Sequence, residues 1–132
     1  MLAQKKEKIK GSKKVTTEKR EIVPFTTLEI EDNFEVFLEM GEKPELKIEA
    51  DDNLHDIINV DIRDQTLRVY TRKEAIRQKK LIVKITYTKE LNVVSVKNDA
   101  TLNAIQEILV DNITIKTFDN AKLFLNVSSK NF

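Results

Sequence analysis

The side chains best suited to chemistry in this sequence are carboxylates. The densest group lies in EADDNLHD, Glu49–Asp56, where oxygen ligands of the kind that Ca²⁺ prefers occur close together. The spacing differs from that of an EF-hand loop, because the turn glycine and the terminal glutamate are missing. The alternative is a strand end followed by an aspartate-capped turn, with Leu54, Ile57 and Ile58 on the core and His55 on the exposed side. We favour this turn and expect no metal site.

A second set of carboxylates could do acid–base work on a glycosidic bond, as paired carboxylates do in glycoside hydrolases. Its members are Asp99, Asp111 and Asp119. However, Asp99 and Asp119 occur at expected chain corners, where turn geometry alone favours aspartate. Nothing in the sequence sets two of these groups at a working separation. We therefore expect no catalytic residues, and a carbohydrate-active enzyme is the last-ranked alternative.

The composition excludes several other kinds of site. The chain has no Cys, which excludes disulfides, thiolate metal sites and a cysteine nucleophile. With His55 as the single histidine, there is no basis for a histidine metal site or a Ser-His-Asp triad. Two glycines are too few for a phosphate-binding loop. We expect no cofactor, and no apolar run is long enough for a transmembrane helix.

The charge is distributed unevenly along the chain. Residues 1–20 carry eight Lys and Arg against two Glu, whereas the remainder carries 15 basic and 20 acidic residues. We treat residues 1–10 as a basic N-terminal arm, a signal-peptide remnant or linker. No aromatic residue interleaves with its lysines, so we expect no nucleic-acid partner. Ala3-Gln4 resembles the end of a secretory signal, which predicts an exported protein whose native signal peptide is removed before Gln4.

Alternation of apolar and polar residues dominates the rest of the sequence. Such a pattern buries one face of a strand and leaves the other in water, so it predicts an all-β chain of short strands. The alternating segments are Thr27–Glu31, Phe34–Met40, Glu45–Ala50, Ile58–Ile62, Thr66–Thr71, Leu81–Tyr87, Ile113–Thr117 and Lys122–Val127.

The connections between these segments use Asn and Asp in place of glycine. These residues tolerate positive φ and form hydrogen bonds with their own backbone. Met40–Glu45 reads as a hairpin-like connection, and Arg72–Lys80 as a basic connection with room for a helical turn. Thr101–Val110 has apolar residues at helical spacing, but we favour strand, corner and strand there.

We favour two strands and a corner in Thr101–Val110 because the sequence repeats itself there. VSVKNDATLNA, Val94–Ala104, has an echo 21 residues later in IKTFDNAKLFLNV, Ile115–Val127. A period near 20 residues is typical of a solenoid, in which each coil stacks its apolar face on the next. Asn98-Asp99-Ala100 and Asp119-Asn120-Ala121 would be successive corners. We expect a two-residue slip between the copies before the corner.

Several motifs in order resemble a known family. Gly11–Ile22 resembles its opening Gly-Ser-x-x-x-Val-x-x-x-x-Arg-x-Val/Ile, with one residue fewer between Ser12 and Val15, and NFEVFLEMG resembles its Gly-x-Phe-x-Val-x-Leu strand, with Asn33 before Phe34 where the family has glycine. IEADDNL, Ile48–Leu54, IRDQTLRVY, Ile62–Tyr70, and the two corners fit later elements. The chain thus resembles the putative auto-transporter adhesin, head GIN domain family, and residues 11–132 are expected to form one head GIN-like β domain.

The resemblance implies a right-handed parallel β-solenoid (β-helix-like) that stops short of the family's usual C-terminal coils; the alternative is an antiparallel β-sandwich. It further implies a non-catalytic, exported module of the cell envelope that binds a surface glycan or an envelope protein. The alternative is a periplasmic structural or sensor module that binds protein through solenoid ends. We also expect a homo-oligomer through an exposed solenoid end. The expected binding faces carry outward polar residues such as Glu35, Lys47, Arg68, Lys84, Lys116 and Lys122.

Overall fold

The computed structural model describes residues 6–104, 108–110, 114–117, 122–124 and 127–129. Apart from the short 3₁₀-helix η1 (Asp52–Ile57), all regular elements described are strands, so the all-β prediction is confirmed. The strands are β1 (Lys8–Lys10), β2 (Val15–Arg20), β3 (Thr27–Ile30), β4 (Glu35–Met40), β5 (Glu45–Asp51), β6 (Ile58–Arg63), β7 (Thr66–Thr71), β8 (Glu74–Ile76), β9 (Leu81–Tyr87), β10 (Val93–Val96), β11 (Thr101–Ala104), β12 (Ile108–Val110), β13 (Thr114–Thr117), β14 (Lys122–Phe124) and β15 (Val127–Ser129).

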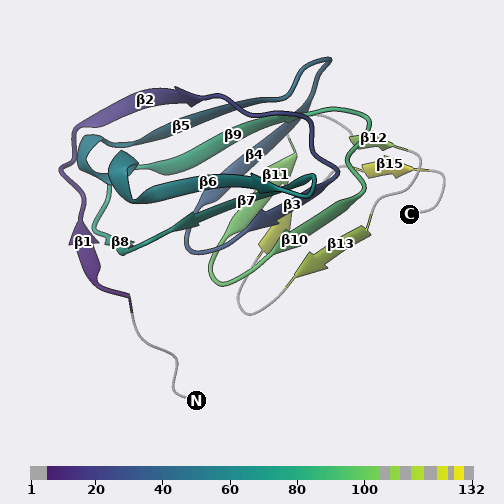
Figure 1. Cartoon of the computed structure of the whole chain (residues 1–132). Coiled ribbons are helices and arrows are strands. Elements are labelled where there is room, and N and C mark those ends of the chain that lie inside the picture. The colour runs from purple at the N-terminus through teal and green to yellow at the C-terminus, as the bar shows by residue number, and fades with distance from the viewer. Residues whose placement is uncertain (1–5, 105–107, 111–113, 118–121, 125–126, 130–132) are drawn as a thin grey trace.

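Two larger sheets form the body of the molecule (Figure 1). One has the order β13-β10-β3-β7-β6, and the other has the order β14-β11-β4-β9-β5-β2. Alternate residues of both sheets are buried in a single hydrophobic cluster, for example Leu28 and Val69 from the first and Val36 and Ile85 from the second. The period-two pattern of the sequence therefore supplies one shared core and two outer polar faces.

The strand directions lie between the two predicted architectures. Strands β3, β4, β7, β9, β10, β11, β13 and β14 make parallel pairs within the sheets. In contrast, β2 and β5, β5 and β9, and β6 and β7 pair antiparallel. The sheets are mixed and neither closes, so the described strands form neither a parallel solenoid throughout nor a purely antiparallel sandwich.

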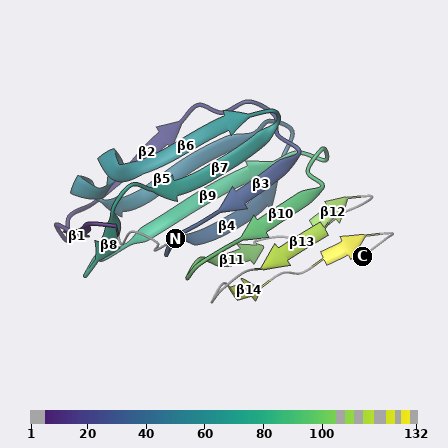
Figure 2. The same cartoon turned by 60° about the horizontal axis from the view of Figure 1, so that its bottom comes forward.

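The repeat in the sequence corresponds to stacked strands (Figure 2). Val94 lies beside Ile115 in the pair of β10 and β13, and Thr101 lies beside Lys122 in the pair of β11 and β14. Both offsets equal 21 residues, so the expected two-residue slip before the corner is wrong. The slip comes one strand later, because Ile108 of β12 lies beside Val127 of β15. Within Thr101–Val110, the two expected strands are confirmed as β11 and β12, and the expected corner between them lies outside the described residues.

Two connections differ from their predictions. Met40–Glu45 does link successive strands, but β9 lies between β4 and β5, so the two do not form a hairpin. The segment Arg72–Lys80 contains strand β8, paired in parallel with β1, where we expected room for a helical turn. Because β1 includes Lys8–Lys10, the last part of the basic arm is tied to the body, and its Ile9 packs against the core.

Asparagine and aspartate turn the chain as predicted. Asp32, Asp64 and Asn98 have φ values of 69°, 52° and 60°. Gln65 follows Asp64 with φ of 63°, so the hairpin of β6 and β7 closes on two residues of positive φ, the pattern of a type I′ turn. At the corner after β10, Ala100 is fully buried, as expected for a small residue in a tight bend.

Candidate binding surface

The acidic segment Glu49–Asp56 has a structural role: its side chains form hydrogen bonds with residues near the N-terminus and with the loop before β9. We call this hydrogen-bonded segment the clasp. The carboxylate of Asp51 is fully buried and accepts backbone N–H bonds from Lys13, Lys79 and Lys80, each with a shortest distance of 2.9 Å. Burial disfavours the charged carboxylate, but these backbone hydrogen bonds outweigh it and hold the pKa of Asp51 below its usual value. The segment therefore ties residues near the N-terminus to the loop before β9.

The neighbouring side chains extend the same clasp. Asp52 accepts a hydrogen bond from the Ser12 hydroxyl, and Asn53 accepts one from the Ser12 backbone N–H and donates one to the Lys10 carbonyl. Leu54, Ile57 and Ile58 are buried as predicted. No group of three His, Cys, Asp or Glu side chains placed to hold a metal ion occurs among the described residues.

The prediction that His55 lies on the exposed side of the turn is wrong. Its side chain is buried, and Nε2 lies 2.9 Å from the Thr16 hydroxyl and 3.1 Å from the Thr16 carbonyl. Nδ1 lies 3.4 Å from a carboxylate oxygen of Glu18. Strand β2 covers η1 and encloses the imidazole, an arrangement that local sequence does not indicate.

The close packing of the clasp at Gly11 gives a testable prediction. A Cβ at this position would lie 2.2 Å from the Asp51 carboxylate oxygen and 2.7 Å from the Gln78 Cα. We expect Gly11→Ala to lower the free energy of unfolding by about 1–3 kcal/mol, because the backbone must shift to admit the methyl group. Urea denaturation checks this. Gly41→Ala is a poor control, since its Cβ would meet a Thr86 methyl at 2.6 Å, whereas Ser12→Ala keeps the backbone unchanged and should cost less.

Of the three carboxylates considered for acid–base chemistry, the structure describes Asp99. Asp99 is exposed in the turn between β10 and β11. Asp111 and Asp119 lie outside the described residues. The absence of catalytic activity accordingly stays a prediction.

The six outward-facing residues of the sequence analysis are all exposed, but they divide between two faces. Arg68 of β7 and Lys116 of β13 lie on the outer face of the five-stranded sheet. The other four lie on the outer face of the six-stranded sheet: Glu35, Lys47, Lys84 and Lys122.

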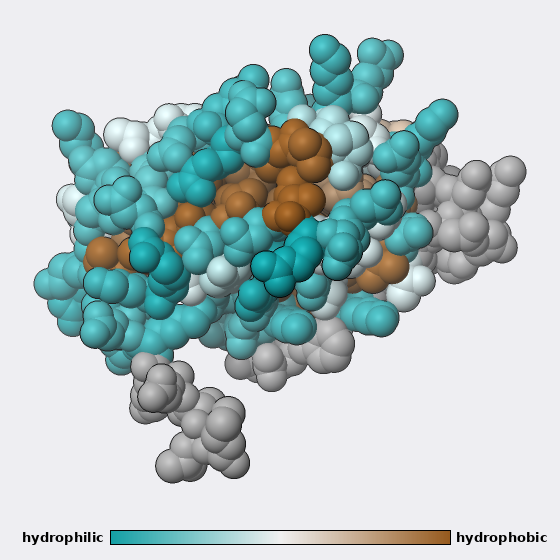
Figure 3. Space-filling view, viewed as in Figure 1, coloured by the Kyte–Doolittle hydropathy of each residue, from teal (hydrophilic) through white to brown (hydrophobic). Residues whose placement is uncertain are grey.

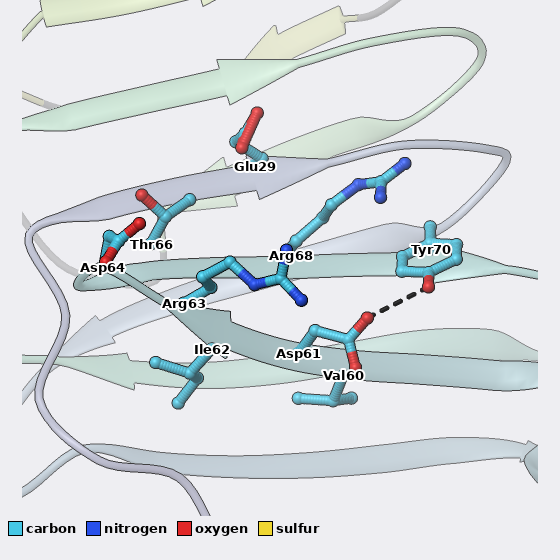
Figure 4. A pocket seen from close by; sticks show the side chains of 9 residues that line it. All are labelled: Glu29, Val60, Asp61, Ile62, Arg63, Asp64, Thr66, Arg68 and Tyr70. Atoms are coloured by element: carbon cyan, nitrogen blue, oxygen red, sulfur yellow. Dashed lines mark hydrogen bonds between the residues drawn. The ribbon is translucent and has the colours of Figure 1, made fainter.

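On the first of these faces, one row of side chains crosses the whole sheet. The register places these residues side by side from β13 to β6: Lys116, Ser95, Glu29, Arg68 and Asp61. We call this outer surface of the five-stranded sheet the Arg68 face. A hollow of about 690 Å³ lies at its β6 end, lined by Arg68, Tyr70, Arg63, Asp61 and their neighbours (Figure 4).

Arg68 is the centre of a preorganised network in this hollow. Its Nε donates to a carboxylate oxygen of Glu31 at 2.6 Å, and its guanidinium carbon lies 4.1 Å from the centroid of the Tyr70 ring. The Tyr70 hydroxyl donates to Asp61 at 3.0 Å (Figure 4). The hydrogen bond to Glu31 raises the pKa of Arg68 further above its usual value, so this side chain stays charged.

The network offers donors, acceptors and an aromatic side chain within one open hollow. A guanidinium supplies several fixed N–H donors, carboxylates supply acceptors, and a tyrosine presents a ring with a polar tip. Such a set suits a ligand rich in hydroxyl groups. We singled out Arg68 from the sequence but missed Glu31, Tyr70 and Asp61. The turn at Asp64-Gln65 could have revealed Asp61, since a two-residue turn places it opposite Arg68.

Within the described residues, no helix has the length and apolar character needed to span a membrane. The sequence comparison finds one family: the model described as putative auto-transporter adhesin, head GIN domain, matches residues 24–132. No curated protein matches the sequence.

Three solved structures share the fold. A putative adhesin from Parabacteroides merdae has a TM-score of 0.74 at 27% identity, over 92% of this chain and 55% of its own. A putative adhesin from Bacteroides fragilis has 0.75 at 26%, over 93% and 62%. A putative lipid binding protein from Parabacteroides distasonis has 0.79 at 17%, over 93% and 54%, which shows likeness of fold alone. The chain thus spans less than two thirds of the length of each.

Proposed function

Because this chain belongs to the putative auto-transporter adhesin, head GIN domain family, we propose that it is a non-catalytic, exported module of the cell envelope that binds a surface glycan. The adhesin names of its relatives from Parabacteroides merdae and Bacteroides fragilis support a binding role and export. The proposal places the binding site on the Arg68 face.

The observation that carries this proposal is the network of Glu31, Arg68, Tyr70 and Asp61. Its members are held by one another before any ligand arrives, so little side-chain entropy is lost on binding. Its groups are exposed or half-buried, and they lie on an open sheet face that can contact several units of a polymer. Repeated weak contacts of this kind add through multivalency.

The proposal includes an architecture for the second half of the chain. The two successive three-strand turns, β10-β11-β12 and β13-β14-β15, stack in parallel. We propose that this region is a parallel β-solenoid, in which each turn adds one strand to the Arg68 face. Lys116 of β13 lies in the same row as Arg68, which is the alignment that a repeating ligand would require.

The proposed function predicts selective loss of binding on one face. On an array of bacterial surface polysaccharides, Arg68→Ala and Tyr70→Ala should each weaken binding to the best-bound polysaccharide at least about tenfold, roughly 1.4 kcal/mol. Tyr70→Phe should lose less, because it keeps the ring and removes only the hydrogen bond to Asp61. Affinity is measured by biolayer interferometry with the immobilised polysaccharide.

The matched control is Lys84→Ala, which removes an exposed cation from the outer face of the six-stranded sheet. It should bind as the unaltered protein does. Equal losses for Lys84→Ala and Arg68→Ala would move the site away from the Arg68 face. No binding by the unaltered protein to any polysaccharide would contradict the glycan proposal as a whole.

A further inference from the structure

Strand β6 is a free edge of the five-stranded sheet. It pairs with β7 on one side, and among the described strands none pairs with its other side. The space-filling view shows a hydrophobic band along β6, bordered by polar side chains (Figure 3). Val60 and Ile62 are partly buried and pack against the core, as does Ile22 from the segment after β2. An exposed edge with apolar side chains is a template for pairing with another strand.

The hairpin fixes which backbone groups point outward from this edge. Arg63 and Thr66 close the two-residue turn, so Arg63 and Asp61 direct their N–H and C=O groups to β7. Val60 and Ile62 alternate with them and direct theirs to the free edge. Ile58 would do the same, but its carbonyl already accepts a hydrogen bond of 3.1 Å from Arg20. The open part of the edge is therefore Val60 to Ile62.

The outward side chains beside this open edge have opposite charges. Asp61 and Arg63 are both exposed on the Arg68 face. Charges on an edge strand usually prevent pairing of identical chains. Here the two signs alternate along one strand, so an antiparallel second copy can place each beside its opposite. No ion pair or hydrogen bond within the described part of the chain engages the Arg63 side chain.

Three two-fold registers are possible for two antiparallel copies of β6. An axis at Val60 would set Ile58 opposite Ile62, where Arg20 occupies the Ile58 carbonyl. An axis at Asp61 would set two carboxylates directly opposite each other, which is unfavourable. An axis at Ile62 pairs the two Ile62 residues and sets Asp61 of each copy opposite Arg63 of the other. Of the three, only the last register sets opposite charges against each other, and it bonds the open backbone groups of Ile62 in one copy to those of Ile62 in the other.

We infer that β6 is the interface for a second copy of this chain, paired antiparallel about Ile62, with two reciprocal ion pairs between Asp61 and Arg63. This goes beyond the proposed function and differs from the self-association expected at a solenoid end. The pair joins two five-stranded sheets into one continuous sheet. It also places two Arg68 faces side by side, so a dimer presents two copies of the candidate site to one polymer.

Charge exchange tests both the interface and its register. Asp61→Arg would set two arginines opposite each other at both ion-pair positions, and Arg63→Asp would set two carboxylates there. Each variant alone should have a dimer dissociation constant raised about tenfold or more, because opposed like charges repel. An equimolar mixture of the two should regain the affinity as a heterodimer, since every position then pairs opposite charges. Sedimentation velocity over a concentration series, with native mass spectrometry of the mixture, measures this.

The matched control is Lys116→Asp, a charge reversal on β13 at the opposite edge of the same sheet, which should dimerise as the unaltered protein does. Melting temperatures of all variants verify that they fold. Three results would each overturn the inference: a protein that stays monomeric at every concentration, a mixture that does not form heterodimers, or an equal loss in Lys116→Asp. None of these depends on glycan binding, so failure here leaves the proposed function to its own test.

Discussion

Replacing Asp51 by alanine should lower the free energy of unfolding by about 3–5 kcal/mol, one of the largest effects in this molecule. The substitution leaves three backbone N–H groups without their buried acceptor, and each unsatisfied buried donor costs about 1–3 kcal/mol. These donors belong to Lys13, Lys79 and Lys80, so the loss also releases the segment near the N-terminus from the body. Urea denaturation measures the stability, and hydrogen exchange at these amides locates the release.

The ionised form of Asp51 makes this contribution dependent on pH. Its pKa in the folded protein is lower than in the unfolded chain, where it is about 3.9. The stabilisation is therefore fully present above the unfolded pKa and is lost as the pH falls through the folded one. In Asp51→Asn the difference in stability from the unaltered protein should be large at pH 7 and should shrink below about pH 4.

The control for both measurements is Asp56→Asn, because Asp56 is exposed on η1, the short helix that directly follows Asp51. It should change stability by less than about 0.5 kcal/mol. An effect of Asp51→Ala no larger than that of Asp56→Asn would show that the buried hydrogen bonds do not hold the clasp together. A difference for Asp51→Asn that does not vary with pH would contradict the pKa assignment.

The local parts of this fold could be predicted from sequence because their causes are local. Alternation of apolar residues located β3, β4, β5, β6, β7, β9, β13 and β14 but missed β1, β2 and β8, since a strand shows this pattern only where it buries one face. Asp64 and Asn98 marked turns because their side chains tolerate positive φ. The stacking of β10 on β13 was also predictable, because the 21-residue period of the repeat specifies the register in which Val94 lies beside Ile115.

The order and direction of the other strands could not be predicted in this way. A half-buried strand shows the same alternation whether its neighbour runs parallel or antiparallel. Met40–Glu45 therefore looked like a hairpin, although β9, about 40 residues further along, inserts between β4 and β5. The same reason explains His55, whose burial depends on β2 crossing η1 and bringing Thr16 to its ring.

The residues of the candidate site likewise divide into those that local sequence could indicate and those that depend on strand pairing. Arg68 could be chosen because it is a charged residue in an alternating strand. Its partners come from three strand neighbourhoods: Tyr70 from its own strand, Asp61 from the hairpin and Glu31 from the end of β3. Of these positions, only that of Asp61, across the hairpin of β6 and β7, could be expected from a short stretch of sequence. The ion pair with Glu31 requires the parallel pairing of β3 with β7, which no short stretch of sequence specifies.

Replacing Phe34 by alanine should destabilise the fold by about 3–5 kcal/mol, the amount typical of a large aromatic side chain removed from a close-packed core. Phe34 is 1% exposed and directly precedes β4, and its carbonyl accepts the Thr101 N–H from β11. The cavity would lie where the repeated strands join the rest of the six-stranded sheet. Urea denaturation checks the loss of stability.

Phe37, three residues further along β4, is the matched control, since the alternation places it on the outer face, where it is half-buried. Phe37→Ala removes the same atoms three residues further along the chain and should cost about 1 kcal/mol or less, because little apolar area leaves the core. Equal costs for the two variants would mean that the faces of β4 are not assigned as the register requires. A large cost for Phe37→Ala alone would mean that the buried and outward faces of β4 are the opposite of those assigned here. The same would then hold for every outward residue of the six-stranded sheet.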